Sequence, residues 1–513
     1  MAASVPAEAT RRRYKKLLAR FAAQPVPVWV RGFRGPFEEP GCDVAQIFEA
    51  SVAKGDSKAS LFEWASQYMD GDGLSNIVVP VMRFDGDGRA DIHYGLLLGD
   101  PSDAAKLARE NPTKDPGHFP FKVQGIVLEA EEQSWREQRA HLSSAFLPGQ
   151  QLKPLLPTLQ RGVSELLDRW AGLQGPLEAH DELHHAALDF FLQAMIGAKG
   201  LLPPTPRESL AIREAFNLDG VNLEDLPRTE ATRLEFALRV LRCGATPPGP
   251  LLERLLSIDD DEKRVSSVKD FLTAGHDTTA HTLEWVLLEL ARHPEVQEAC
   301  RMEAESIFRE LGGRSLCYED LLRFEVTSAV IFETLRLWGP AWTVFRRELT
   351  ADRSFGGRVG GVTVPQGTAV NFWFYGHHHS AKLWGPDACE FRPLSRDFSD
   401  AELQRGTSRT PSSERFHPFS LPGRDCMGKN FSLMEMRLLL PQMLCRFRVQ
   451  LAEPWRQQLE GLKCGSGDLF NGLIQKPGPA KPPKGLCFEL EPLHLASQLP
   501  SARELTAMER SRL

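Results

Sequence analysis

The sequence lacks long apolar runs, paired cysteines and an excess of positive charge. None of its apolar stretches approaches the roughly 20 residues that a membrane-spanning helix needs, so no transmembrane helix is predicted. Its nine cysteines form no Cys-x-x-Cys pair, which leaves zinc-ribbon and thioredoxin-like sites without their usual support. The formal net charge of −7 argues against general affinity for nucleic acid.

A glycine-rich dinucleotide fingerprint is also absent. No Gly-x-Gly-x-x-Gly follows a predicted strand, so the sequence predicts no fused reductase. The scattered cysteines suit a reducing compartment, and a content of 42% hydrophobic and 25% charged residues is ordinary for a globular protein. These features predict an intracellular protein whose 513 residues can bury a large core.

Composition divides the chain into three parts. Residues 1–25 form an Arg/Lys-rich arm, which fits a plastid or mitochondrial targeting segment, a solvated arm or a helix on a membrane surface. Residues 26–495 are expected to form a single domain, because no low-complexity linker divides them, and residues 496–513 are a polar tail. Short apolar runs predict strands over residues 28–98, and helical periodicity dominates afterwards. The predicted fold class is mainly α with small β-sheets (α+β).

The longest predicted helix covers Val265–His293 and stops before Pro294, which disfavours helix in the preceding residue. A second helix is expected from Pro294 to the glycine pair at 312–313, and a third over Glu319–Trp338. A helix of about 28 residues is about 40 Å long, so the first one can cross an entire domain.

Cys426 lies in the stretch Phe419–Gly428, between a tight turn and a predicted helix. Pro422–Gly423 suits a type II turn, with proline at the first central position and glycine at the second. The first N–H groups and the dipole of the following helix favour a thiolate over a thiol. Phe419 would shield the sulfur, and Arg424 adds positive charge and can hold a carboxylate. The stretch predicts a sulfur ligand for a metal, with an unliganded buried cysteine as the alternative.

A second candidate site interrupts the longest predicted helix at Ala274–Thr279. Glycine costs a helix interior about 1 kcal/mol relative to alanine, so Gly275 indicates a groove or distortion where a ligand binds. Asp277 and Thr278 place an acid beside a hydroxyl, which suits proton transfer to a bound group. A polar patch on a half-exposed helix is the alternative.

The histidines give a weaker signal. His276 and His281 are five residues apart, so they do not share a helix face as i, i+4 metal ligands would. The run His377–His379 can bind a metal adventitiously, but an ordinary loop is the favoured interpretation.

Two pairs of residues share helix faces. Glu333 and Arg336 stand at i, i+3, which by itself indicates a surface ion pair of a few tenths of a kcal/mol. Trp135 and Arg139 place an indole N–H and a guanidinium one turn apart, where they can hold a carboxylate or simply cover a helix surface.

Taken together, these stretches resemble the signature motifs of the cytochrome P450 superfamily. Phe419–Gly428 is similar to the family's haem loop, Phe-x-x-Gly-x-Arg-x-Cys-x-Gly, with Pro422 in place of the first glycine. Ala274–Thr278 matches the family's oxygen-activation motif, and Glu333–Arg336 its Glu-x-x-Arg pair. The resemblance extends over nearly the whole chain after residue 90 and implies the P450 fold, with haem between the long central helix and the helix of the Cys loop.

The resemblance also implies roles for individual residues. Cys426 is the expected axial ligand of haem b (iron protoporphyrin IX), with Phe419 and Arg424 beside it in the loop. Gly275 would open a groove for dioxygen, while Asp277 and Thr278 relay protons. The propionate partners and the structural arginine are expected at Trp135, Arg139, Arg347 (with Arg346 as rival) and Arg396, the last as the third member of the pair at Glu333 and Arg336.

The function that the resemblance implies is a haem-dependent monooxygenase. It would insert one oxygen atom from dioxygen into a lipophilic small molecule by hydroxylation or epoxidation. Electrons would come from a separate NADPH-dependent flavoprotein reductase or a ferredoxin, and a peripheral contact with a membrane stays open.

Two departures from the family keep alternatives open. The N-terminal anchor typical of microsomal members is missing, and the lid region, around residues 203–250, is short, either as a real truncation or as a loss from the gene model. The alternatives are a haem-thiolate isomerase or dehydratase acting on hydroperoxides, and a non-catalytic haem-binding protein with a truncated lid.

Overall fold

The computed structural model describes residues 17, 19–21, 24–36, 59–110, 113–118, 125–127, 129–217, 226–343, 346–399, 402, 413–460, 482–483 and 485–493. Most of the predicted basic arm and the whole polar tail lie outside these residues. Among the helices in the described ranges, none has both the length and the apolar character needed to cross a bilayer.

The described chain folds mainly into helices, joined by three small sheets, which confirms the predicted fold class. The helices are α3 (Ala59–Tyr68), α4 (Pro101–Glu110), α5 (Glu132–Ser143), α6 (Leu156–Ala171), α7 (Ala179–Phe191), α8 (Pro206–Ala215), α9 (Leu226–Leu241), α10 (Pro250–Leu256), α11 (Asp261–Ala274), α12 (Asp277–Arg292), α13 (Pro294–Leu311), α14 (Glu325–Trp338), α15 (Phe374–His379), α16 (Ala381–Trp384), α17 (Lys429–Arg446) and α18 (Trp455–Glu460). The strands are β1 (Ile77–Phe84), β2 (Ala90–Leu98), β3 (Leu177–Glu178), β4 (Arg347–Glu348), β5 (Arg353–Gly357), β6 (Gly360–Val364), β7 (Ala369–Phe372), β8 (Phe447–Leu451) and β9 (Cys487–Pro492).

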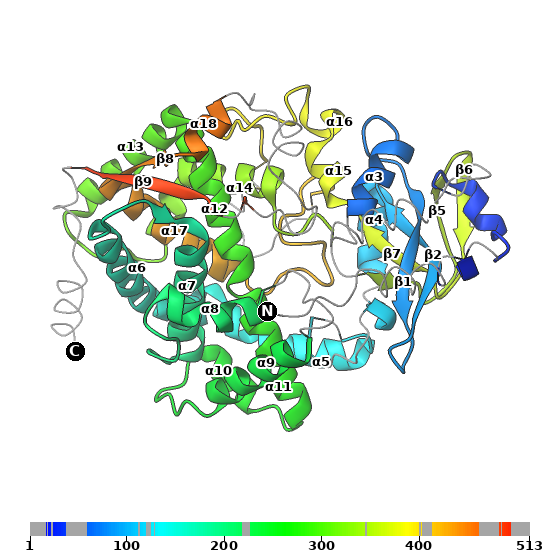
Figure 1. The fold of residues 1–513 in the computed structure, drawn as a ribbon, viewed down its shortest axis with the longest axis horizontal. Helices are drawn as coiled ribbons and strands as arrows, with labels where there is room; N and C mark the ends of the chain where they lie inside the picture. The colour runs from blue at the N-terminus through cyan, green and yellow to red at the C-terminus, as the bar shows by residue number, and fades with distance from the viewer. Residues whose placement is uncertain are drawn as a thin grey trace.

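Helices and strands occupy opposite ends of the molecule (Figure 1). The large helical body contains α6 to α14 and α17, and β8 and β9 run across its edge. At the other end, β1, β2 and β7 lie beside α3 and α4, with β5 and β6 outermost. This arrangement leaves α5, α15 and the segments around them between the two ends.

The main sheet has the order β1-β2-β7-β4. β1 and β2 form an antiparallel hairpin, which confirms the strands predicted from their apolar runs. β7 runs parallel to β2, and β4 is antiparallel to β7, with Arg347 opposite Val370. Through its pairing with β7, the two-residue strand β4 forms one edge of this sheet.

The helical core is centred on α12, which is buried from Thr279 to Leu290. Trp285 of α12 stacks on Trp338 of α14 with ring centroids 4.3 Å apart and planes inclined by 8°. The indole N–H of Trp338 donates to Glu289 Oε1 at 2.7 Å, so the buried carboxylate is paired. Large aromatic surfaces of this kind dominate core energetics.

The long helix predicted over Val265–His293 is wrong in its continuity, because the structure has two helices in its place. α11 begins at Asp261, where the Asp260 side chain caps it by accepting from two backbone N–H groups. It ends at Ala274, and α12 begins at Asp277 after His276 takes the non-helical angles φ −127° and ψ −48°. The break falls at the glycine that the sequence marked as the weak point.

The following helices agree better with the prediction. α13 begins at Pro294 and ends at Gly312, whose φ of +57° is the left-handed value that glycine accepts freely. The third predicted helix is shorter than expected, because Asp320–Arg323 forms a 3-10 turn before α14 starts at Glu325. The region around residues 203–250, which the resemblance predicts to be a short lid, contains α8 and α9.

Candidate functional site

The loop before α17 folds back on itself around Cys426. The Cys426 N–H donates to the Phe419 carbonyl at 2.9 Å, which closes the loop. Gly423 has a φ of +94°, as the predicted turn requires, and a Cβ there would lie 2.9 Å from the Ala108 carbonyl of α4. Glycine is therefore needed both for the turn and for the close approach of α4, while the proline before it supplies the fixed φ.

The Cys426 side chain is surrounded by protein but keeps exposed surface, which indicates open space beside it. Burial raises the pKa of its thiol, although a hydrogen bond from the Gly428 backbone and the charges of Arg139 and Lys429 act the other way. The same residue is exposed to solvent. A side chain can be enclosed by protein and still exposed only where open space lies beside it. The Gly428 N–H favours a thiolate, as predicted for this helix start, but burial opposes it more strongly and the pKa of the thiol is raised.

Three cations gather next to this loop, of which Lys114 and Arg347 are buried and Arg424 is half-buried. Lys114 and Arg347 face each other in an isolated antiparallel bridge, and Arg424 is two residues before the cysteine. Burial lowers the pKa of Lys114 well below its ordinary value, and the charges of Arg347 and Arg424 lower it further. Burial likewise lowers the pKa of Arg347 to about 10 and that of Arg424 to about 9. The three positive charges repel one another in the protein alone, and an anion bound among them would offset that repulsion.

Sequence reasoning missed Lys114. A single lysine between a threonine and an aspartate carries no motif, and only the pairing of its backbone with that of Arg347 brings it to the cluster. Arg346, the rival of Arg347, is placed elsewhere: it donates to the carbonyls of Met82 at 2.6 Å and Gly117 at 3.1 Å. It also forms an ion pair with the buried Asp115.

Trp135 and Arg139, predicted to hold a carboxylate together, have separate partners. Arg139 of α5 donates to the backbone carbonyl of Asp425 at 2.6 Å and pairs with its carboxylate at 3.0 Å. The buried Trp135 ring lies under Arg424, whose guanidinium carbon is 4.0 Å from the ring centroid. Both side chains therefore orient the Cys loop itself, with the indole holding Arg424 by a cation–π contact.

The residues of the predicted oxygen-activation motif point in different directions. Asp277 has no exposed surface and lies 3.5 Å from His184 Nδ1 on α7. Thr278 is half-buried and donates to the Ala274 carbonyl at 3.1 Å. The structure does not bring the acid and the hydroxyl together as a direct pair. A Cβ on Gly275 would meet the Phe191 ring at 2.7 Å, so the glycine lets that ring approach the chain.

Thr279 ties α12 to the Cys-loop helix. Its hydroxyl donates to Ser432 Oγ at 3.0 Å, and Phe191 of α7 contacts Phe431 edge to face. The predicted motif and the predicted loop are thus neighbours in space, although about 150 residues separate them. The hydrogen-bonded pair itself is 153 residues apart in sequence.

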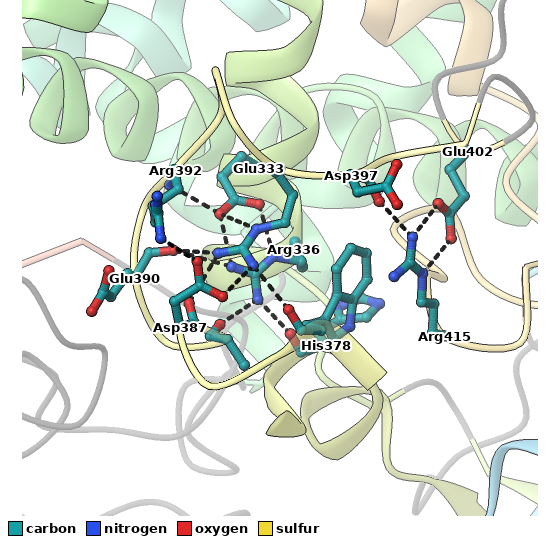
Figure 2. Close-up of polar contacts among 12 residues, drawn as sticks. Glu333, Arg336, His378, Asp387, Glu390, Arg392, Asp397, Glu402 and Arg415 are labelled. Atoms are coloured by element: carbon teal, nitrogen blue, oxygen red, sulfur yellow. Dashed lines mark hydrogen bonds and ion pairs between the residues drawn. The ribbon is translucent and has the colours of Figure 1, made fainter. Parts of the chain in front are cut away.

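Glu333 and Arg336 form a buried network instead of the surface pair that the spacing alone indicates (Figure 2). The carboxylate accepts two bonds from Arg336, each 2.8 Å long. It also accepts one from Arg396 Nε at 3.2 Å. Arg336 continues to the His378 carbonyl at 2.6 Å, so the network joins α14 to the α15 region.

The predicted histidine loop is a helix. His377–His379 belong to α15, and burial lowers the pKa of His377 to about 4 and that of His379 to about 3. His377 Nε2 lies 3.0 Å from the Gly99 carbonyl, and His378 Nε2 accepts from the His417 backbone N–H at 2.9 Å. These histidine side chains therefore stabilise the protein interior.

The donor set fits a haem. A sulfur with open space beside it suits an axial ligand, and the three cations suit the two carboxylates of a porphyrin. Cys426 and Arg424 come from the Cys loop, Arg347 from β4, and Lys114 from the segment that pairs with β4.

Comparisons with known proteins agree with the geometry. Residues 254–463 match the family model described as Cytochrome P450. Cytochrome P450 4F3 of Rattus norvegicus is 36% identical over 190 residues, which cover 37% of this chain and 34% of that protein. Cytochrome P450 4A2 of the same species is 28% identical over 414 residues, covering 70% and 77%. Leukotriene-B4 omega-hydroxylase 3 of Mus musculus is 35% identical over 211 residues, covering 40% and 38%. The chain thus matches only about a third of the length of the first of these relatives.

Proposed function

We propose that this chain, whose residues 254–463 are similar to the cytochrome P450 family, is a haem-thiolate monooxygenase of that family and acts on a lipophilic small molecule. The observation that supports this most directly is the Cys426 side chain, which is surrounded by protein and yet has open space beside it. Cys426 would supply the thiolate ligand of haem b, and Lys114, Arg347 and Arg424 would be the cations that offset its carboxylates.

When bound, the haem supplies dioxygen activation, and an anionic axial sulfur favours cleavage of the O–O bond. The chain holds that sulfur in place: Cys426 N–H is bonded to the Phe419 carbonyl, and the Gly428 backbone donates to the sulfur. Arg139 fixes the neighbouring Asp425, so the loop cannot turn without breaking two bonds to α5.

We assign the last proton transfer to Thr278. Its Oγ1 holds a proton against the Ala274 carbonyl and can turn to release it toward a bound group, because the residue is only half-buried. Gly275 leaves room for the Phe191 ring beside this point. Asp277 is the proposed acid behind Thr278, although its carboxylate is turned toward α7.

The name of one relative supports a substrate class for this proposal. One relative's name is that of a leukotriene omega-hydroxylase, which supports a lipid carboxylic acid as the first candidate, hydroxylated near its chain end. Electrons would come from a separate NADPH-dependent flavoprotein or a ferredoxin.

One observation favours a second candidate. Since Asp277 faces imidazoles instead of the hydroxyl of Thr278, the site also suits a haem-thiolate isomerase or dehydratase of hydroperoxides, which needs no proton relay. The two activities differ in their requirements: the monooxygenase consumes dioxygen and external electrons, and the isomerase needs only the hydroperoxide.

The test combines a spectrum with an assay. The haem-loaded protein should give the red-shifted Soret band of a thiolate-ligated ferrous carbonyl, Cys426→Ser should lose it, and Cys243→Ser, a half-buried cysteine elsewhere, should keep it. Fatty acids are then incubated with NADPH, a flavoprotein reductase and isotopically labelled dioxygen. One labelled oxygen atom per product supports the monooxygenase. Conversion of fatty-acid hydroperoxides without reductant, together with no labelled product from fatty acids in the complete mixture, would move the assignment to the isomerase.

A further inference from the structure

Four side chains with metal-ligand atoms converge between α7 and α12, which pack along each other (Figure 1). His180 and His184 are one turn apart on α7, and His281 and Glu284 are one turn apart on α12. The ligand atoms of all four lie within 4.8 Å of one another. We propose that this group binds one divalent transition-metal ion of the zinc class.

The distances within the group match a compact coordination sphere. Glu284 Oε1 lies 3.0 Å from His184 Nε2 and 3.3 Å from His180 Nδ1. In a tetrahedral zinc site with bonds of 2.0–2.1 Å, ligand atoms are about 3.3 Å apart. The ring centroids of His184 and His281 are 4.5 Å apart, so the third imidazole is close to the other ligands. Small side-chain rotations then suffice to place an ion among them.

The local sequence holds the two α7 ligands in register. The Glu178 side chain caps α7 by accepting from the Asp181 N–H, which fixes the start of the helix just before His180. His180 and His184 are therefore on one face as i and i+4, the spacing that helical zinc ligands use. His281 and Glu284 present the matching i, i+3 pair from the facing helix, an arrangement that metal sites between packed helices also use.

Charge favours a cation at this place. Glu284 has 1% of its surface exposed and Asp277 has none, so two carboxylates are buried against the same imidazoles. Burying carboxylates is costly unless positive charge accompanies them, and a divalent ion supplies two charges at once. Three imidazoles and one carboxylate are also a ligand set that suits zinc.

Asp277 is in the position of a second-sphere partner. His184 faces Glu284 with Nε2 and Asp277 with Nδ1, at 3.0 Å and 3.5 Å. A neutral imidazole has one acceptor and one donor nitrogen. With an ion at Nε2, the Nδ1–H is free to donate to Asp277, which is the carboxylate–histidine–metal arrangement common in zinc sites.

The site has a route to solvent on one side. The His180 side chain is 37% exposed, while those of His184, His281 and Glu284 are 2%, 1% and 1% exposed. The ion would therefore enter past His180 and be enclosed by the other three ligands.

A second grouping shares one ligand with the first. His184, His276 and Asp277 also bring ligand atoms within 4.8 Å. His276 already has Nδ1 2.7 Å from the Leu272 carbonyl, which leaves only Nε2 for an ion. The four-ligand group offers more donors and an entry path, and the variants below separate the two.

The probe is Zn²⁺, and the readout is metal content instead of turnover. The haem-loaded full chain is treated with a chelator, dialysed against Zn²⁺ and then against buffer, and analysed for zinc and iron by mass spectrometry. We expect one zinc per chain in addition to the haem iron. In a calorimetric titration, His180→Ala and Glu284→Gln should each weaken Zn²⁺ binding at least tenfold. Zn²⁺ should also raise the melting temperature of the wild type and not that of the variants.

His185→Asn is the matched control. This histidine neighbours the group in sequence, but its Nδ1 lies 2.8 Å from Ser209 Oγ on α8, so the variant removes an imidazole without removing a ligand. It should keep full zinc stoichiometry. His180 is at the solvent side of its helix, so its variant folds even where a buried one does not. The proposal is overturned if the wild type retains no zinc, if both ligand variants bind as tightly as the control, or if only His276→Asn abolishes binding.

Discussion

At the scale of single residues, Arg346 and Arg347 show how neighbours in sequence take unrelated tasks. Successive side chains point to opposite sides of an extended chain, so one of the two faces the Cys loop and the other faces away. Arg347 is fully buried beside Lys114, while Arg346 donates to two backbone carbonyls near β1 and pairs with Asp115. Arg347 is therefore placed to interact with a bound anion, whereas Arg346 stabilises the fold.

Arg347→Met and Arg346→Met should therefore fail in different ways. Losing Arg347 removes one cation facing the haem carboxylates, so haem affinity should fall about tenfold or more while the haem-free protein keeps or gains stability. Losing Arg346 leaves the buried Asp115 with less positive charge near it and should lower stability by about 2–4 kcal/mol. Haem titrations and thermal melts of both variants measure this. Equal haem affinity in the two proteins would contradict the assignment.

At the scale of elements, the break between α11 and α12 depends on Gly275, which has no side chain. Gly275 N–H still bonds to the Phe271 carbonyl at 2.8 Å, and His276 then leaves helical geometry. A Cβ at the glycine would lie 2.7 Å from both the Phe271 carbonyl and the Phe191 ring. The junction thus depends on α7 as much as on α11.

Gly275→Ala should destabilise the protein by about 1–3 kcal/mol, because the added methyl group overpacks a site that includes backbone. Adding Phe191→Leu should recover only part of the loss, since the carbonyl contact stays. Gly149→Ala, at a glycine with open space around its Cβ position, is the control and should be neutral or slightly stabilising. Denaturation midpoints compare the three proteins, and no loss for Gly275→Ala would show that the junction is loose.

Asp270 links α11 to the chain segment before α5 by a hydrogen bond. Its carboxylate accepts from the Val127 N–H at 2.9 Å, and burial raises its pKa from 3.8 to about 7, against smaller opposing effects of that bond, Arg233 and Lys269. The folded protein then binds more protons than the unfolded chain between about pH 4 and pH 7. Stability therefore falls as pH rises through this window, and the penalty is fully present above about pH 7.

Asp270→Asn keeps an acceptor for Val127 and removes the titration. At pH 8 the variant should be more stable than the wild type by about 1–3 kcal/mol. This range is smaller than the full pKa shift implies, because the Asp270 side chain is only half-buried and solvent screens its charge. Below about pH 4 the two should be alike. Melting curves recorded from pH 4 to pH 8 test this, and parallel pH profiles would be the contrary result.

At the scale of the whole molecule, the sequence predicted most of what depends on local patterns. The fold class, the strands β1 and β2 and the turn at Gly423 followed from periodicity and turn residues, whereas the pairing of the two strands was not predicted. Continuity of the central helix did not, because the clash that fixes its break involves Phe191, a residue of another helix.

The candidate site, too, could be predicted only where it depends on local sequence patterns. Glu333 and Arg336 have helical spacing, but their burial depends on chain segments around His378 and Arg396 that only the fold brings near. The sequence predicts no metal pair for His276 and His281, which are five residues apart. Only the packing of α7 supplies His184 as their neighbour.

The network at Glu333 provides the largest test of this long-range assembly, because it links α14 to α15 at His378 and to the later segment that contains Arg396 (Figure 2). Glu333→Gln leaves the buried guanidinium groups of Arg336 and Arg396 without their carboxylate, so stability should fall by about 3–5 kcal/mol and haem retention with it. Glu402→Gln is the control: its partner Arg415 keeps 27% side-chain exposure and can be solvated, so the loss should be about 1–2 kcal/mol. Denaturation midpoints and haem content measure both. If the two variants lost stability equally, the Glu333 network would be one ion pair among many, and the α14 junction would depend on apolar packing instead.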